Sequence, residues 1–187
     1  MKKRHASNNI LSLCLTALFA ALICVCTFIS VPLPLGYFNL GDVAMLLGAY
    51  VLGFPAAISA AIGASMADVL MGFAVYAPAT AIIKGLCVLT ACTILLLTKR
   101  FPHKKRFWLV RLILSSVTAE VVMVAGYLLF EALVLGYGAA ALASVLGNCM
   151  QGFCGIVGSI TIYGALKLSG AVSFIKKLSH RSDKLNI

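Results

Sequence analysis

Six long apolar stretches occupy most of this chain and limit it to a membrane protein. The stretches cover residues 10–31, 40–53, 55–71, 78–98, 112–135 and 139–166. Charged residues make up only 11% of the sequence, whereas soluble domains carry about a quarter. A membrane-crossing helix needs about 20 apolar residues, so six spans and their short loops account for nearly the whole chain. We expect an all-α integral membrane protein, one membrane domain over residues 1–187 with six transmembrane helices.

The second and third stretches are the shortest, and only the Gly53-Phe54-Pro55 break separates them. Glycine permits unusual backbone angles and proline can open a helix, so we expect a tight turn there. The two stretches could be full spans, or residues 40–71 could form a re-entrant hairpin that enters and leaves the membrane on one side. The first stretch is longer than the apolar core of a secretion signal, which favours a retained span.

The positive charge is concentrated at the ends of the apolar stretches. The net charge is +10, and every Lys and Arg except Lys84 lies within residues 2–4, 99–111 or 167–184. Basic residues gather on the cytoplasmic side of membrane proteins. This distribution predicts cytoplasmic termini, including a basic tail at 170–187, in a multi-pass membrane protein. The expected partner of these charges is the anionic lipid bilayer and not nucleic acid.

The most informative residues are the few polar side chains inside the apolar stretches. An ionisable group in hydrocarbon is costly, by about 2.5–3.5 kcal/mol on insertion scales, and is therefore a candidate functional residue. The residues of this kind are Asp42, Asp68, Lys84, Glu120 and Glu131, with Asn39, Asn148 and Gln151 as neutral companions. In the predicted topology most of them lie in the outer half of the membrane. That bias predicts a pocket open to the outside and closed below.

Helical spacing gathers some of these side chains on common faces. At 100° per residue, Tyr127 and Glu131 each fall within about 20° of Glu120, so the three residues form a single polar stripe. Asn148 and Gln151 share a face of the last stretch. We therefore expect one face of each of these two helices to look inward.

Each polar residue also has a purely structural interpretation. Asn39 and Asp42 could cap the start of a helix and stabilise its dipole. Asp68 could be a charge at the membrane interface or the partner of Lys84, and the sequence favours such a structural role over a direct contact with a ligand. The two amides of the last stretch could form hydrogen bonds between helices.

Several short segments carry a family resemblance when they are taken together. They are Gly36-Tyr37-Phe38-Asn39-Leu40-Gly41-Asp42, Asp68, residues 76–85 (YAPATAIIKG), residues 119–127 (AEVVMVAGY) and residues 147–152 (GNCMQG). In this order, and with six apolar stretches in a chain of this length, the sequence resembles the substrate-binding S-components of energy-coupling factor (ECF) vitamin transporters. The resemblance covers about residues 10–168.

The resemblance implies a six-helix subunit that captures a vitamin at the outer face of the membrane. The first extracellular loop, with Gly36 and Tyr37, would act as a lid. An A-x-x-x-A pair on the first helix contacts a membrane coupling subunit in this family, and Ala17 and Ala21 match that pattern. Two cytoplasmic ATPases would drive transport, and the resemblance implies a multi-pass protein of a prokaryotic plasma (cell) membrane. This sequence has no G-x-x-x-x-G-K-[ST] phosphate loop, so we expect ATP hydrolysis to be the work of those partners.

The expected substrate site combines a few polar groups with a mostly apolar cavity, which suits a small ligand. Its predicted residues are Asn39, Lys84, Glu120, Tyr127, Asn148 and Gln151. Carboxylates outnumber the single lysine, which favours a ring rich in hydrogen-bond donors, such as a hydroxymethylpyrimidine- or pyridoxine-like vitamin or precursor. Pantothenate and riboflavin stay open as alternatives.

Two other classes of function compete with this hypothesis. The main alternative is a self-sufficient, proton-coupled secondary transporter in which Glu120 or Glu131 takes up the proton. An intramembrane enzyme is disfavoured, because His5, His103 and His180 all lie in the basic segments and the sequence has no H-E-x-x-H pattern. We therefore expect no catalytic residues, no metal ion and no cofactor.

Overall fold

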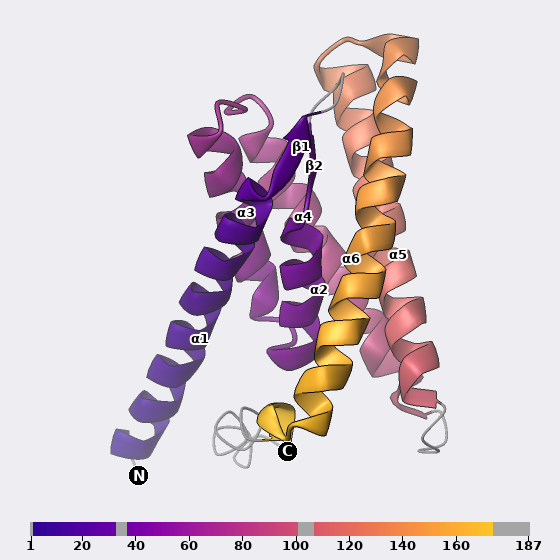
Figure 1. Cartoon of the computed structure of the whole chain (residues 1–187). Helices are drawn as coiled ribbons and strands as arrows, with labels where there is room; N and C mark the ends of the chain where they lie inside the picture. Colours follow the sequence, from indigo (N-terminus) through magenta and orange to yellow (C-terminus); the bar gives the residue numbers. More distant parts are fainter. Residues whose placement is uncertain (1, 33–36, 101–106, 174–187) are drawn as a thin grey trace.

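The computed structural model describes residues 2–32, 37–100 and 107–173 as a bundle of helices (Figure 1). The helices are α1 (Lys2–Phe28), α2 (Gly41–Val51), α3 (Ala56–Leu70), α4 (Ala77–Leu97), α5 (Phe107–Leu129) and α6 (Leu142–Leu168). Single turns of other helix types follow α4 (Thr98–Arg100) and α5 (Phe130–Val134) and precede α6 (Gly138–Ala141). The predicted α-helical class is therefore observed.

The helices differ in whether they are long enough to cross a membrane. Four segments of the described chain are sufficiently long and apolar: Ile10–Phe28, Ala77–Leu97, Phe107–Val134 and Gly138–Leu168. Helix α2 has 11 residues and α3 has 15. At 1.5 Å per residue they measure about 16 and 22 Å, against a hydrocarbon core of about 30 Å. The structure thus shows four full-length candidates and two short apolar helices, and not six full-length spans.

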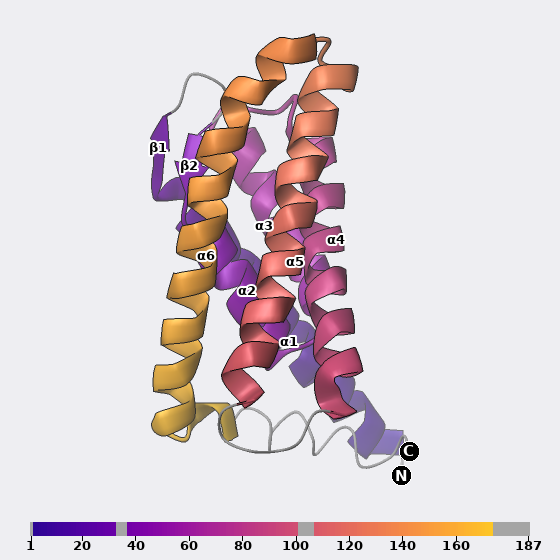
Figure 2. The same ribbon diagram turned by 90° about the vertical axis from the view of Figure 1, so that its right-hand side faces the viewer.

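Helix α2 lies at the centre of the bundle. It contacts α1, α3, α4 and α6, and every one of its residues except Val43 is buried. The other helices surround it in chain order, with contacts of α1 with α3, α3 with α4, α4 with α5, and α5 with α6 (Figure 2). The short hairpin of α2 and α3 is closed by Gly53, whose φ of 73° is accessible to glycine, followed by Pro55 at the start of α3. The break at residues 53–55 is confirmed as a turn.

A small β-hairpin interrupts the all-helical pattern between α1 and α2. Strands β1 (Ser30–Pro32) and β2 (Tyr37–Asn39) pair antiparallel, with Ser30 opposite Asn39. We call the end of the bundle that carries this hairpin the hairpin end (Figure 1). The opposite end is the basic end, because Lys99, Arg111 and Lys167 lie near the end of α4, the start of α5 and the end of α6. Of the two predicted lid residues, Gly36 lies outside the described residues and Tyr37 is described by its backbone alone.

Small residues allow α1 and α3 to pack closely. Ser59 Oγ donates a hydrogen bond to the Thr16 carbonyl oxygen at 2.7 Å. A Cβ atom placed on Gly63 would collide with the Ala20 carbonyl oxygen and lie 3.1 Å from Ile23 Cβ. Such contacts are typical of helices that meet in a membrane through small side chains.

We expect Gly63→Ala to lower the free energy of unfolding by about 1–3 kcal/mol, because the added methyl group forces α1 and α3 apart. Thermal unfolding in detergent measures the change. Gly85→Ala is the matched control, since the nearest atoms to its added Cβ lie 3.8 Å away. If both variants shift the melting temperature equally, close packing at Gly63 is not the cause.

Candidate functional site

A buried polar network joins three helices and the hairpin near the hairpin end. Lys84 of α4 forms an ion pair with Asp42 Oδ1 of α2. Gln151 Nε2 of α6 donates a hydrogen bond to Asp42 Oδ2 at 2.6 Å. Both oxygens of Asp42 are therefore bonded, one to a cation and one to an amide. Buried charges are tolerated when they are paired and hydrogen-bonded in this way.

Asn39 connects this network to the hairpin. Its backbone N–H and its Nδ2 both donate to Gln151 Oε1, at 3.1 and 3.0 Å. Its Oδ1 accepts a hydrogen bond from the Gly41 N–H at 2.8 Å. Asn39 therefore accepts from the first backbone N–H of α2, although the N-cap residue itself is Leu40, which makes no side-chain capping bond. Asn39 also attaches the end of β2 to α6.

Glu120 of α5 lies beside the network without a partner of its own. The residue is 5% exposed, and neither carboxylate oxygen has a hydrogen-bond partner among the described residues. Gly155 of α6 separates Glu120 from Asp42: a Cβ placed there would lie 3.2 Å from Glu120 Oε1 and 2.9 Å from Asp42 Cβ. A buried acceptor with unmet hydrogen-bonding capacity is costly to stability, which makes it a candidate for a ligand contact.

Tyr127 closes the network on the α4–α5 side. Its hydroxyl lies 3.0 Å from Thr80 Oγ1, and its ring centroid lies 5.6 Å from Lys84 Nζ. A cavity of about 10 Å³ lies between these side chains, Asn39, Asp42 and Asp68. That volume is close to the space one water molecule needs. The site is closed in this conformation.

The structure brings together five of the six predicted site residues. Asn39, Lys84 and Gln151 belong to the hydrogen-bonded network, and Glu120 and Tyr127 lie against it. Asn148 is half-buried on α6 and has no hydrogen bond to another described side chain, so its role stays a prediction.

Asp42 is the residue that the predicted site omitted. Its position in the first turn of a helix favoured a structural interpretation, and the sequence made Asp68 a candidate partner of Lys84. The structure instead shows Lys84 paired with Asp42, while Asp68 lines the same small cavity. The available signal was the requirement that a buried lysine have an anionic partner, but the sequence did not show which aspartate met it.

Glu131, predicted on one stripe with Glu120 and Tyr127, is buried in a second polar cluster. Its Oε2 accepts a hydrogen bond from Ser144 Oγ, and its Oε1 accepts one from the Tyr76 hydroxyl at 3.4 Å. Burial and the neighbouring carboxylate raise the pKa of Tyr76 to about 12. Glu120, Tyr127 and Glu131 all face into the bundle, as the stripe requires; Glu131 lies in a separate cluster because about 16 Å of helix separates it from Glu120.

Residues 7–168 match the family model described as ECF-type riboflavin transporter, S component. The chain belongs to this family of ECF S-components. The match spans α2 to α6 and most of α1, and therefore includes the whole polar network. No curated protein sequence matches the chain closely.

Members of this family are subunits of membrane transporters. They bind vitamin-type substrates and associate with an ECF module. It is a family of transporter subunits and not of enzymes. The four full-length apolar helices agree with a place in the membrane.

Proposed function

We propose that this S-component captures a B vitamin or vitamin precursor at the hairpin end and presents it for ATP-driven uptake. The observation that carries the proposal is the buried network of Asp42, Lys84 and Gln151, which is bonded directly to the hairpin through Asn39. Charged groups are rarely placed inside a membrane bundle without a functional reason. The hairpin is the only β-structure among the described residues. It leads into α2 (Figure 1) and is bonded to the network through Asn39.

The charge distribution supports an orientation with the hairpin end outside the cell. Lys99, Arg111 and Lys167 all lie at the basic end, at the ends of α4, α5 and α6. Basic residues in short loops favour the cytoplasm. The polar network would then face the exterior, where the substrate arrives.

The closed site supports a mechanism in which the hairpin moves to admit the ligand. A cavity of about 10 Å³ is far smaller than the pockets of about 300–1,000 Å³ that hold small ligands. Displacement of β2 would break both bonds between Asn39 and Gln151. The ligand would then donate a hydrogen bond to the freed Gln151 Oε1. In this proposal residues 32–38, including Gly36 and Tyr37, form the lid.

The polar groups favour a nitrogen heterocycle that carries hydrogen-bond donors. Glu120 offers two acceptor oxygens, and displacement of Asn39 would free a third acceptor, Gln151 Oε1. The Lys84 ammonium offers the donors. The chain's own charges favour a hydroxymethylpyrimidine- or pyridoxine-like ring, whereas the name of the matching family favours riboflavin. Pantothenate, which lacks such a ring, ranks last.

Titration of the purified protein with these four compounds tests the proposal. We expect one ring compound to bind with an affinity at least tenfold above that of pantothenate, which corresponds to about 1.4 kcal/mol. Calorimetry measures binding of all four ligands, and a rise in melting temperature with ligand concentration provides an independent readout. Folded protein that binds none of them would contradict the proposed capture of vitamins.

The remaining partners are a membrane coupling subunit and two cytoplasmic ATPases. Ala17 and Ala21 are both exposed on α1, as a helix-docking surface requires, and small residues allow two helices to approach closely. The alternative of a proton-coupled transporter is distinguished by uptake into vesicles that contain this chain alone. Uptake without the ATPases would favour the alternative.

A further inference from the structure

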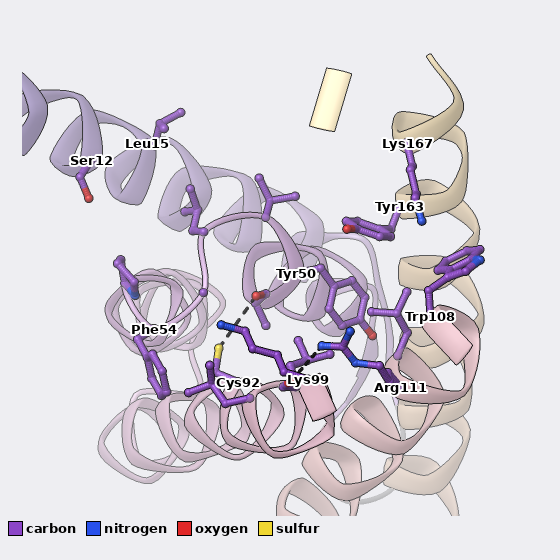
Figure 3. Close-up of a pocket in the computed structure, with 18 of the residues that line it drawn as sticks. Ser12, Leu15, Tyr50, Phe54, Cys92, Lys99, Trp108, Arg111, Tyr163 and Lys167 are labelled. Atoms are coloured by element: carbon purple, nitrogen blue, oxygen red, sulfur yellow. Dashed lines mark hydrogen bonds between the residues drawn. The ribbon is translucent and has the colours of Figure 1, made fainter. Parts of the chain in front are cut away.

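A second cavity lies at the basic end, away from the polar network. Its volume is about 560 Å³, and it lies between α1, the turn at residues 52–55, α4, α5 and α6 (Figure 3). Its origin is the short central helix: α2 ends at Val51, while the outer helices continue toward the basic end (Figure 1). The central helix therefore does not fill the space between the outer helices at the basic end.

The charged groups that line this cavity are all positive. They are Lys99, Arg111 and Lys167, and no Asp or Glu occurs among the described lining residues. Arg111 is held in place, because Nη2 donates to the Leu95 carbonyl oxygen at 2.9 Å and Nε donates to Thr98 Oγ1 at 3.2 Å. Figure 3 shows Lys99 and Arg111 reaching into the space between the helices. A cavity of this charge attracts an anion.

Aromatic side chains form one wall of the cavity. Tyr50, Tyr163 and Trp108 pack in a row, with ring centroids 5.4 Å and 6.4 Å apart. Lys167 Nζ lies 4.4 Å from the Trp108 ring centroid. Tryptophan, tyrosine and basic residues gather at the depth of lipid headgroups. The position of the cavity at the ends of three spanning helices agrees with that depth.

The opposite wall is apolar and comes mainly from α1. Leu11 and Leu15 line the cavity there, while Leu95 and Leu96 line it from α4. A free phosphate would leave these side chains without an apolar partner. A molecule with an anionic head and a hydrocarbon tail satisfies both walls, because each wall then contacts a group of its own polarity.

We propose that this cavity binds the headgroup of one anionic phospholipid. Lys99, Arg111 and Lys167 contact the phosphate, and the glycerol and upper acyl chain lie against the leucines of α1 and α4. Basic pockets between transmembrane helices on the cytoplasmic side are a known mode of lipid recognition. The site is separate from the polar network, so it stands whether or not a vitamin binds at the hairpin end.

Native mass spectrometry of the delipidated protein with phosphatidylglycerol or phosphatidylcholine tests this inference. We expect one phosphatidylglycerol to bind in preference to phosphatidylcholine, and the double variant Lys99→Gln/Lys167→Gln to weaken it by about 10- to 30-fold. Both lysines are exposed, so the variant should keep its ligand-free melting temperature. The control variant Lys2→Gln/Lys3→Gln removes the same two charges from the N-terminus and should leave the affinity unchanged.

Two outcomes would overturn the inference. Equal weakening by the control variant would show that lipid binding follows net charge and not this cavity. Binding of glycerol 3-phosphate or inorganic phosphate as tightly as phosphatidylglycerol would show a site for soluble phosphates without a role for the acyl chain.

Discussion

Replacing Lys84 by methionine is expected to lower the free energy of unfolding by about 3–5 kcal/mol, since a buried charge would lose its partner. The Lys84 and Asp42 side chains are only 5% and 1% exposed, so solvent cannot replace the missing cation. The single hydrogen bond from Gln151 Nε2 would be left to stabilise the Asp42 carboxylate. Denaturant or thermal unfolding in detergent measures the loss.

The double variant Asp42→Asn/Lys84→Met separates an electrostatic cause from a packing cause. Asparagine keeps the shape of Asp42 and an oxygen for Gln151, but it carries no charge. We expect the double variant to recover at least half of the stability lost in Lys84→Met, because position 42 no longer carries a buried charge without its cation. Equal losses in the single and double variants would mean that the methylene chain of Lys84, and not its charge, holds the helices together.

Replacing Glu120 by glutamine is expected to reduce vitamin affinity by about 10- to 150-fold, the range expected when one hydrogen bond to a charged group is lost. The melting temperature of the ligand-free protein should stay the same or rise. Neither Glu120 oxygen has a hydrogen-bond partner among the described residues, so the structure loses no internal bond. Affinity is measured with whichever compound binds in the four-vitamin titration.

Glu131→Gln is the matched control for that experiment. Glu131 is also a buried glutamate of the same chain segment, 3% exposed, but Ser144 and Tyr76 donate to its two oxygens. We expect this variant to lower the melting temperature and leave vitamin affinity unchanged. A Glu120→Gln protein that keeps its affinity, or that loses as much stability as Glu131→Gln, would assign Glu120 a structural role.

Lys84 illustrates how far the site could be predicted. Its isolation in an apolar stretch marked it as a buried charge, because every other basic residue lies in the basic segments. Its partner could not be predicted in the same way. Asp42 and Asp68 occupy similar positions at the ends of two short helices, and the choice between them depends on how α2 and α4 pack.

Glu131 shows what helical periodicity leaves open. The 100° rule places it on one face with Glu120 and Tyr127, and these side chains do face into the bundle. Position along the helix separates them: about 16 Å of helix lies between Glu120 and Glu131, so Glu131 contacts Tyr76 and Ser144 and not the network around Asp42. Which residues of other helices lie at each level depends on tertiary packing.

The sequence by itself determined the membrane class, the number of apolar helices, the turn at Gly53 and Pro55, and the small set of buried polar candidates. These properties depend on local sequence: the spacing of apolar residues marks the helices, and glycine and proline mark the turn. The tertiary structure decided that Asp42 pairs with Lys84, that the site at the hairpin end is closed, and that a basic cavity lies below the short α2. Those features arise where helices distant in sequence meet, and their geometry depends on relative helix lengths and packing that no single segment encodes.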